Sequence, residues 1–521
     1  MSHSPATVLL RSYLRRDRTM LAAWIAGGCL LYVSQAKSVE QMYPTPAALE
    51  EAAQNLSSSP AMLAMTGPAR ALDTLGGQVA WQTAAFGAVV AGLMSMLIVG
   101  RHTRVEEETG RDELVRSGAV GRLTPLALAT VLALAANVVL GTLTAASLIA
   151  SGLPAAGSVA LGAALSASGW VFTGVSAVAA QLTAGARASY AVTGSVIGAA
   201  YFARAVGDTG PHALSWASPI GWGQATRPYA DERWWPLALS VLATALLLLL
   251  AVRLHAQRDH GSGVWSDRPP RLRDADIGSW HLAWHLQRGG LLGWGAATAV
   301  VGLGYGALAT SAEDVVGDSQ FTADLFAGPS VTDGFLGTAL LVLALLAAAA
   351  GVMAAQRPDA EERLRRVDPL LAGPLTRATW SLQHVALSTV SVVLVLLVAG
   401  LSSGLGYAVA TGDPSDAWSL VGAALAYAPA ALTLTAVVRF AHGMAWSASI
   451  IGWLAVGWCA VIAMFGPLLD LPAVLTGLSP FEHVARMPAE PFAAATWAVL
   501  WCVAVLVSAA GQALLAHRDL R

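Results

Sequence analysis

Two short segments of similar sequence concentrate charged side chains in a pattern that suits protein docking. They read EEETGRDELVRSGAVGR over residues 106–122 and EERLRRVDPLLAGPLTR over residues 361–377. At a constant offset of 255 positions the matched pairs are Glu106/Glu361, Glu107/Glu362, Arg111/Arg366, Glu113/Asp368, Gly118/Gly373 and Arg122/Arg377. Acidic residues early and arginines late complement the dipole of a short helix. A single copy would equally suit a solvated cap between two helices, whereas two copies favour docking of a two-fold symmetric partner.

No motif predicts that the chain hydrolyses nucleotide by itself. A P-loop, GxxxxGK[ST], requires a lysine beside glycines. Lys37 is the only lysine in the sequence, and no such glycines surround it. We therefore expect no catalytic residue here. If ATP supplies energy, a separate polypeptide must bind the ATP and its Mg²⁺.

The cysteines and histidines lack the spacing of a disulfide framework or a metal site. Cys29, Cys459 and Cys502 each lie in an apolar run, as small buried residues do. His281 and His285 are four residues apart, which is a possible zinc-binding spacing on a helix. Tryptophans flank this pair and His-Glu-x-x-His is absent, so a helix at a membrane surface is the favoured interpretation. The sequence predicts no metal and no other cofactor in this chain.

The composition is typical of a polytopic membrane protein. Of 521 residues, 55% are hydrophobic and 12% are charged, whereas soluble domains carry about 25% charged residues. This excludes a soluble globular protein, a disordered chain and a nucleic-acid-binding protein. A transmembrane helix needs about 20 largely apolar residues. The twelve windows that qualify are roughly residues 20–36, 79–99, 125–150, 157–183, 188–206, 235–253, 291–311, 334–355, 380–411, 417–438, 443–466 and 491–515.

The distribution of charge predicts the orientation of these windows. Six of the 30 lysine and arginine residues, but 17 of the 32 acidic residues, fall in loops opposite the termini. Positive residues concentrate on the cytoplasmic side of membrane proteins. Both termini are therefore predicted in the cytoplasm, in a multi-pass protein of the plasma membrane. No small-residue cleavage site follows the first apolar run, which we expect to be retained.

The duplicated segments belong to a longer internal repeat. A Ser-Pro pair precedes the sixth and twelfth windows, in LSWASPIGW and LTGLSPFEH, and an Arg-Asp pair closes each half at 258–259 and 518–519. The predicted fold class is therefore an all-α polytopic membrane protein with 12 transmembrane helices in two parallel six-helix repeats. The predicted halves are residues 1–260 and 261–521, with a charged linker at about 255–288. Amphipathic stretches, VLLRSYLRRDR and GSWHLAWHLQR, precede the halves and suit helices in the cytoplasmic interface.

Ionisable residues are rare inside the windows, which disfavours a proton-coupled carrier. Arg204 and Asp470 fall near window ends, and Asn137 is the clearest deep polar residue. Proton relays in membranes usually use carboxylates. Five aromatic residues are candidates to line an apolar substrate cavity. An alternative explanation is that they lie at the membrane–water interface, where tryptophan and tyrosine concentrate. They are Trp81, Tyr201, Tyr305, Trp453 and Trp458.

Further patterns concern helix packing and the exterior loops. Small-xxx-small spacing occurs at Gly194/Gly198, Gly302/Gly306 and Gly400/Gly404, and ordinary close packing is its simplest interpretation. Segments 207–234 and 467–490 contain proline and tryptophan and either re-enter the outer leaflet or form plain loops. The loop after the seventh window is acidic, with Glu313, Asp314, Asp318, Asp324 and Asp333.

The order of these motifs resembles that of the ABC-2-type permeases of actinobacteria. The shared features are the EE-x-x-GR-x-E-L run, a later Gly-x-x-Arg where Pro-Val-x-Arg is commoner, the Ser-Pro segments and the terminal Arg-Asp. The resemblance covers nearly the whole chain. Within that family the chain is most similar to the twelve-span, tetronasin-type exporters of polyketide antibiotics.

The resemblance implies that one twelve-span chain works with two copies of a separate ATP-binding cassette ATPase. In this family the cytoplasmic loop after the second span of each half is the coupling helix. The implied ATPase-coupling residues are Glu106, Glu107, Arg111, Glu113, Arg122, Glu361, Glu362, Arg366, Asp368 and Arg377. The second copy departs from the family pattern at Arg365, Val367 and Pro369, so the two contacts are expected to be unequal.

The principal hypothesis is a membrane-spanning permease subunit of an ABC exporter, not itself an enzyme. It would move hydrophobic or amphiphilic, drug-like or antibiotic-like compounds outward. Its expected partners are the ATPase, the small-molecule substrate and the lipid bilayer, without nucleic acid. One alternative is a proton- or ion-coupled secondary efflux carrier, and the other is a non-transport membrane scaffold.

Overall fold

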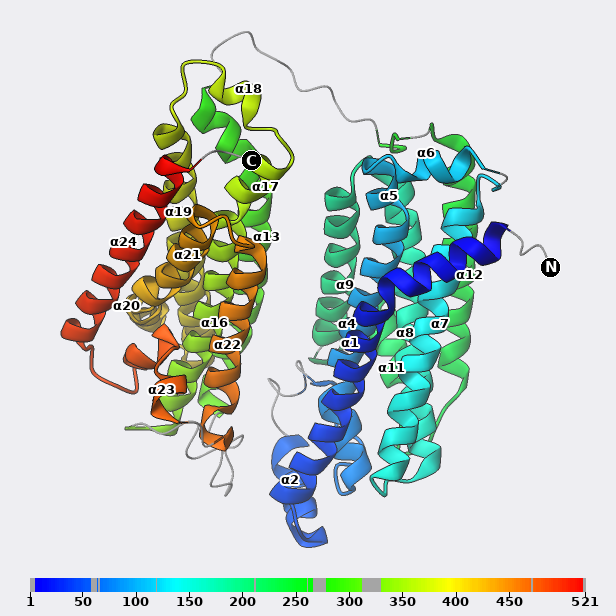
Figure 1. Ribbon diagram of the computed structural model, residues 1–521. Helices are drawn as coiled ribbons and strands as arrows, with labels where there is room; N and C mark the ends of the chain where they lie inside the picture. Colours follow the sequence, from blue (N-terminus) through cyan, green and yellow to red (C-terminus); the bar gives the residue numbers. More distant parts are fainter. Residues whose placement is uncertain are drawn as a thin grey trace. The chain divides into compact units, whose positions relative to one another are not determined.

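The structure is a computed structural model, which describes residues 5–57, 63, 66–118, 120–209, 212–259, 261–265, 278–311, 329–469 and 472–518. Every regular element within these ranges is a helix. The chain divides into two compact units, Met1–Arg271 and Leu272–Arg521 (Figure 1). Several residues of the sequence patterns lie outside the described ranges, namely Glu313, Asp314, Asp318, Asp324, Asp470 and Asp519.

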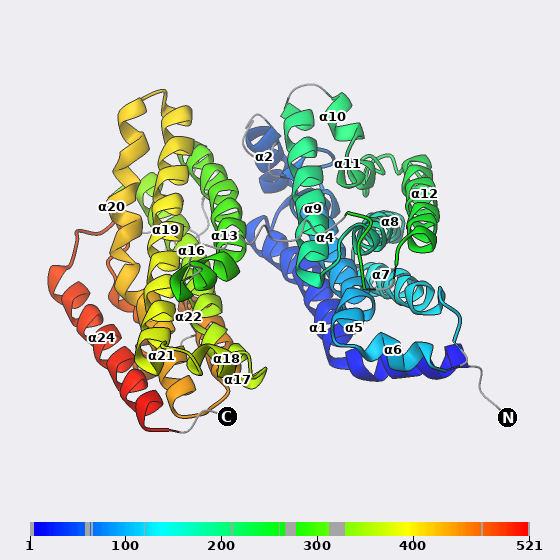
Figure 2. The ribbon, with the colours of Figure 1, turned by 90° about the horizontal axis from the view of Figure 1, so that it is seen from above.

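Unit 1 is a bundle of long helices. These are α1 (Pro5–Met42), α4 (Leu75–His102), α7 (Thr124–Ala150), α8 (Ala155–Leu182), α9 (Ala186–Thr209) and α12 (Trp235–Gln257). The short helices are α2 (Pro46–Ser57), α5 (Arg104–Glu108), α6 (Arg111–Arg116), α10 (Ala213–Trp216) and α11 (Pro219–Gln224). Figures 1 and 2 show α6 lying across one end of this bundle.

Unit 2 contains a second series of long helices. These are α13 (Ser279–Leu308), α16 (Val331–Ala355), α19 (Arg377–Thr411), α21 (Ala428–Gly443), α22 (Ala448–Leu469) and α24 (Ala494–His517). The short elements are η1 (Ala309–Ser311), α17 (Arg357–Arg363), α18 (Asp368–Leu371), η2 (Pro414–Trp418), α20 (Ser419–Ala426), α23 (Ala473–Thr476) and η3 (Pro480–His483). The tenth window is broken at Tyr427, where Pro429 in the first turn of α21 supplies no backbone N–H.

Ten helical segments of the described chain are long and apolar enough to cross a membrane, and they fall on ten of the twelve windows. The other two windows, 188–206 and 443–466, fall on α9 and α22, which lie outside this group of ten. α9 contains Arg187 and Arg204, and the apolar stretch Ala448–Ala463 of α22 is short. The amphipathic stretches before the first and seventh windows are not separate helices, because they form the first turns of α1 and α13.

The two units bury their helices in the same order. The inner segments containing α4 and α8 bury 61% and 72% of their apolar windows, and those containing α16 and α21 bury 83% and 72%. The first and last long helices of each unit bury only 17% to 22% of their apolar windows. They are α1 and α12 in unit 1, and α13 and α24 in unit 2. Leucines on α12, such as Leu246 and Leu249, are exposed. An exposed apolar helix surface of this kind suits contact with lipid.

The segments between the last two long helices of each unit share a buried Ser-Pro pair. Ser218 is the N-cap of α11 and Ser479 is the N-cap of η3, and both serines are fully buried and followed by proline. Proline suits the first position of a helix because the N–H that it lacks has no partner there.

After α11, hydrogen bonds from Arg227 and Arg233 lower the pKa of Asp231 to about 2.

Glycine determines how closely α13 and α19 approach each other. A methyl group at Gly306 would lie 2.0 Å from the backbone oxygen of Ser403, and one at Gly406 would lie 2.3 Å from that of Leu303. At Gly194 nothing would lie within 4 Å of such a methyl group. The small-residue spacing at 302/306 therefore mediates helix contact in unit 2, whereas Gly194 is not needed for close packing in unit 1.

We expect Gly306→Ala to destabilise unit 2, because α13 must move away from α19 to admit the methyl group. Overpacking of this kind costs about 1–3 kcal/mol. The measurement is the melting temperature of the purified chain in detergent, with Gly194→Ala as the control that should melt like the wild type. Equal melting temperatures for the two variants would contradict close packing of α13 against α19.

Candidate coupling site

The first duplicated segment forms two short helices after the end of α4. α5 and α6 are separated by a turn in which Gly110 has a φ of 71°, a conformation that glycine adopts without strain. Glu106 and Glu107 lie in the first turn of α5, and Asp112 and Glu113 lie in the first turn of α6. Negative charge in these turns is stabilised by the helix dipole.

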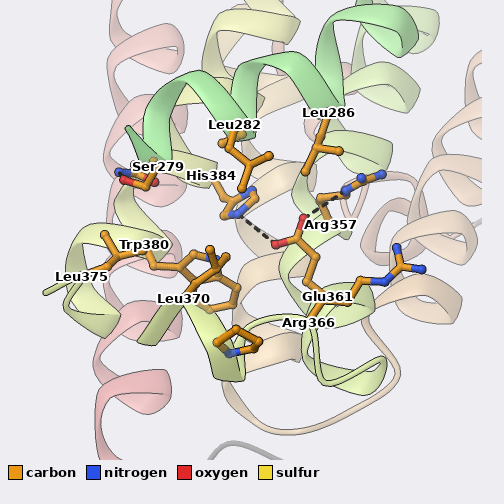
Figure 3. A pocket seen from close by; sticks show the side chains of 13 residues that line it. Ser279, Leu282, Leu286, Arg357, Glu361, Arg366, Leu370, Leu375, Trp380 and His384 are labelled. Atoms are coloured by element: carbon orange, nitrogen blue, oxygen red, sulfur yellow. Dashed lines mark hydrogen bonds and ion pairs between the residues drawn. The ribbon is translucent and has the colours of Figure 1, made fainter. Parts of the chain in front are cut away.

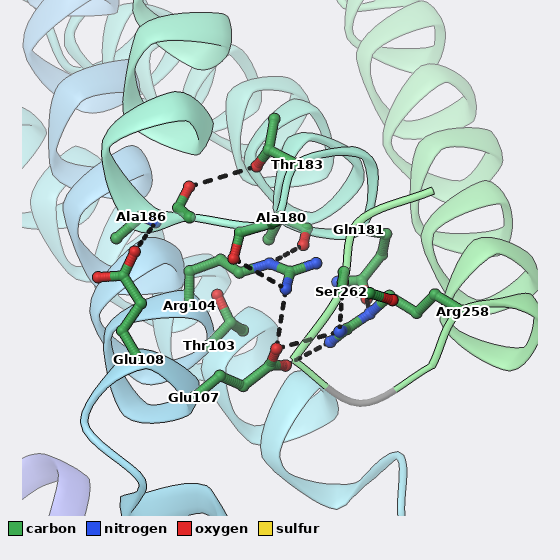
Figure 4. A network of polar contacts seen from close by, with 12 residues as sticks. Thr103, Arg104, Glu107, Glu108, Ala180, Gln181, Thr183, Ala186, Arg258 and Ser262 are labelled. Atoms are coloured by element: carbon green, nitrogen blue, oxygen red, sulfur yellow. Dashed lines mark hydrogen bonds and ion pairs between the residues drawn. The ribbon is translucent and has the colours of Figure 1, made fainter. Parts of the chain in front are cut away.

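Glu107 lies at the centre of a buried cluster of charged and polar side chains (Figure 4). Its carboxylate accepts hydrogen bonds from Arg104 at 2.8 Å and from both terminal nitrogens of Arg258, one at 3.0 Å. Arg104 is fully buried and also donates to the backbone oxygen of Ala180, and Arg258 donates to Gln181 Oε1 at 2.7 Å. We call Arg104, Glu107, Gln181 and Arg258 the first charge cluster. It joins α5 to the ends of α8 and α12.

Glu106 and Asp17 attach α1 to the same end of unit 1. Glu106 forms an ion pair with Arg16. Asp17 is fully buried, and its carboxylate oxygens lie 2.5 Å from His102 Nε2 and 3.1 Å from Arg101 Nε. The first turns of α1 are therefore held to the end of α4 and to α5 by charge.

The second charge cluster, in unit 2, contains the matching glutamates. Glu362 accepts a hydrogen bond from Arg518 at 2.6 Å and lies 2.8 Å from His442 Nε2. Arg518 follows the last residue of α24, so its ion pair with Glu362 corresponds to that of Arg258 with Glu107.

Glu361 completes the second charge cluster on the other side of α17. Its carboxylate lies 3.2 Å from Arg357 Nε and 3.6 Å from His384 Nε2. The other ring nitrogen of His384 lies 3.2 Å from the side-chain nitrogen of Gln287 on α13. The cluster therefore connects α13, α17 and α19, and with Glu362 it reaches α21 and the end of α24.

A second contact is also repeated in the two units. The Arg122 guanidinium donates to the backbone oxygen of Arg258 at 2.7 Å, and the Arg377 guanidinium donates to that of Arg518 at 3.2 Å. Residues matched between the two segments thus make matched contacts. In each unit, both ends of the duplicated segment are tied to the arginine that follows the last long helix.

The residues predicted to couple the chain to an ATPase fall into two groups. The four glutamates point into their units: Glu106, Glu361 and Glu362 are buried, and the Glu107 side chain is 7% exposed. The exposed group comprises Arg111, Glu113, Arg122, Arg366, Asp368 and Arg377. Of these, Arg122 and Arg377 donate hydrogen bonds from their guanidinium groups to backbone oxygens of their own unit. Arg111, Glu113, Arg366 and Asp368 are thus best placed to meet a partner, and that role stays a prediction.

Sequence reasoning missed the internal partners of the glutamates. Arg104, His384 and His442 were not singled out, although each lies at or near a window end, where a charged side chain needs a partner. Arg439 on α21 was also missed. It donates to Ser388 Oγ at 2.5 Å and to Ser508 Oγ at 2.9 Å, which joins α21 to α19 and α24.

In unit 1 the two aromatic candidates for a substrate cavity lie in different surroundings. Trp81 is 5% exposed, donates to the backbone oxygen of Gly67 at 2.7 Å and lines a cavity of about 40 Å³. Tyr201 is half-buried, and its ring centre lies 4.6 Å from the guanidinium carbon of Arg204. Packing accounts for both residues, and substrate contact stays a prediction.

The three candidates of unit 2 also differ in their surroundings. Tyr305 packs edge-on against Phe335, with ring centres 6.0 Å apart. Trp453 is 42% exposed, and Trp458 donates to the backbone oxygen of Leu475 at 3.3 Å. Their role in substrate contact likewise stays a prediction. Within the residues that the structure describes, no group of three or more His, Cys, Asp or Glu could hold a metal ion.

Apolar helices of spanning length, with charge clusters gathered at helix ends, define a polytopic membrane protein. Residues 278–516 match the family described as the C-terminal domain of the multidrug efflux system permease Rv1217c. The chain is 37% identical over 531 positions to the multidrug efflux system permease protein Rv1217c of Mycobacterium tuberculosis (strain ATCC 25618 / H37Rv). The alignment covers 98% of this chain and 95% of that protein. The chain therefore belongs to the family of multidrug efflux system permeases, which confirms the predicted efflux-permease class.

Proposed function

We propose that this chain is the membrane-spanning subunit of an ABC exporter that moves hydrophobic or amphiphilic drug-like compounds outward. ATP and Mg²⁺ would be bound by a separate ATPase, and this chain would carry no cofactor and perform no catalysis. The observation that carries the proposal is the duplicated charged segment, which each unit holds through the same two contacts. Two equivalent segments suit two copies of the ATPase.

We further infer 12 transmembrane helices in two parallel six-helix repeats, with halves 1–260 and 261–521. The equivalent order of inner and outer helices supports this arrangement, and α9 and α22 would supply the two spans outside the group of ten. The excess of arginine beside the duplicated segments supports cytoplasmic termini in the plasma membrane. The loop motifs favour the tetronasin-type subgroup.

The charge clusters suggest how ATPase movement would reach the membrane helices. A segment tethered only by flexible loops would absorb a displacement. α5 is instead anchored through Glu107 to the ends of α8 and α12, and α17 through Glu361 and Glu362 to α19, α21 and the end of α24. A push on either exposed segment would therefore shift several helix ends of its unit together.

The test is efflux of a fluorescent hydrophobic dye from cells that express the chain with an ATPase encoded beside it. We expect efflux to stop on ATP depletion and to persist with a protonophore while ATP is maintained. The control is an ATPase variant without its P-loop lysine, which should be inactive. Efflux that survives ATP depletion but collapses with the protonophore would favour the secondary carrier. A reconstituted complex without drug-stimulated ATPase activity would favour the scaffold.

A further inference from the structure

A cavity of about 230 Å³ lies in unit 2 beneath the first turns of α13 (Figure 3). α13, α17, the segment around α18 and the start of α19 line it. Its apolar lining comes from Leu282, Leu286, Leu370, Leu375 and Trp380. Pockets for drug-sized ligands measure roughly 300–1,000 Å³. This cavity therefore accommodates only one end of a larger molecule.

The sequence match puts a large side chain at the corresponding position of unit 1. The Arg-x5-Trp spacing at residues 18–24 and 288–294 aligns α1 with α13 and pairs Tyr13 with Ala283. Tyr13 is buried and stacks on His102 with ring centres 3.8 Å apart, whereas Ala283 lines the cavity. Exchange of a large aromatic residue for alanine thus accounts for the space beneath α13.

One buried hydrogen-bond donor in the lining of this cavity has no acceptor in the described part of the chain, and a second donor of the lining is exposed. Trp380 is 2% exposed and its indole Nε1 has no hydrogen-bond partner. Buried indole N–H groups normally find an acceptor. Arg366, also in the lining, is exposed, so a ligand can reach its guanidinium. A ligand with several acceptor oxygens would satisfy both groups.

The formal charge of the lining favours an anion. Arg357 and Arg366 contribute two positive charges, and Glu361 contributes the single carboxylate of the lining. Glu361 is engaged by Arg357 and His384. An anionic oxygen group would therefore meet Arg366 without displacing an existing ion pair. Guanidinium groups bind phosphate oxygens through strong, charge-assisted hydrogen bonds.

The surrounding sequence places the cavity at the membrane surface. The first turns of α13 carry Trp280, His281, Trp284 and His285, and the apolar stretch of the helix follows them. Tryptophan concentrates at the level of lipid headgroups. Phospholipid phosphates occupy this level, so the bilayer itself supplies an anionic oxygen group joined to an apolar body.

We propose that this cavity binds the phosphate group of an anionic membrane phospholipid. Arg366 and the Trp380 indole donate to phosphate oxygens, and the leucines contact the first carbons of the lipid. The lipid supports the first turns of α13 from beneath, as Tyr13 supports those of α1. This site connects the membrane surface to the duplicated segment of unit 2, whereas Tyr13 stands at the matching position of unit 1, which makes the two segments unequal.

The test counts phospholipids retained by the detergent-purified chain in native mass spectrometry. After delipidation, the chain is offered dioleoylphosphatidylglycerol, dioleoylphosphatidylcholine or inorganic phosphate. We expect one tightly retained phosphatidylglycerol, which Ala283→Tyr removes by filling the cavity. Arg366→Gln and Trp380→Phe should each weaken retention about threefold to tenfold, since each removes one donor. Arg111→Gln is the matched control in unit 1 and should retain the lipid.

Several outcomes would overturn the proposal. They are unchanged retention in Ala283→Tyr, equal retention of phosphatidylcholine and phosphatidylglycerol, or full displacement of the lipid by inorganic phosphate. Trp380→Phe keeps the ring packing and Arg366 is exposed, so a folding defect in Ala283→Tyr leaves two informative variants. Because the measurement needs neither ATPase nor transport, its result is independent of the proposed function.

Discussion

Replacement of Glu107 by glutamine is expected to destabilise unit 1 by about 3–5 kcal/mol, the usual cost of breaking a buried ion pair from one side. The amide leaves Arg104 and Arg258 with no carboxylate at the centre of the first charge cluster. Arg104 is fully buried, so water cannot replace the lost partner. For a domain of this size the loss corresponds to a fall in melting temperature of about 10 °C. The measurement is thermal unfolding of the purified chain in detergent.

Glu108→Gln is the matched control for this experiment. Glu108 is the neighbouring residue, it is exposed, and its carboxylate accepts one hydrogen bond, from the Ala186 backbone N–H at 2.7 Å. Its replacement should cost about 1 kcal/mol or less. The double variant Glu107→Gln/Arg258→Gln should recover part of the loss, because it also removes one unpaired charge. A Glu107→Gln chain that melts like Glu108→Gln would contradict the buried cluster.

Charge reversal of the four exposed residues of the duplicated segments is expected to abolish assembly with the ATPase. The variant combines Arg111→Glu, Glu113→Arg, Arg366→Glu and Asp368→Arg. Like charges brought together at an interface cost several kcal/mol, so we expect binding to weaken about 100-fold or more. The melting temperature of the delipidated chain alone should not change, because these side chains are exposed and Arg366 then holds no lipid. The measurements are co-purification of the ATPase and drug-stimulated ATPase activity.

The control for this variant is Arg253→Glu, which reverses an exposed charge near the end of α12 outside the duplicated segments. Reversal within one segment at a time tests whether the two contacts are unequal. A complex that survives all four substitutions with normal coupled activity would show that docking lies elsewhere. Charge reversal of the four glutamates would not distinguish lost docking from lost folding, because it also breaks the ion pairs that hold each unit together.

Local sequence patterns predicted much of the fold but not the details of helix continuity. Ten windows coincide with helical segments of spanning length, since hydropathy summed over about 20 residues reports a local property. The tenth window is broken at Tyr427, and the stretches before the first and seventh windows continue into α1 and α13. A proline within an apolar run is only a weak sign of a helix break, and arginines before an apolar run are only a weak sign of a separate helix. Neighbouring helices decide whether the chain bends or continues.

The sequence by itself determined that this is an all-helical membrane protein with a duplicated charged segment and no P-loop. Composition, window length and internal identity establish these points without any knowledge of contacts. Only the tertiary structure decided that the glutamates of the segments face inward while Arg111, Glu113, Arg366 and Asp368 remain exposed. The partners are distant in sequence: 151 positions separate Glu107 from Arg258, and 156 separate Glu362 from Arg518. No local pattern records such a pairing, because it depends on where the last helix of each unit packs.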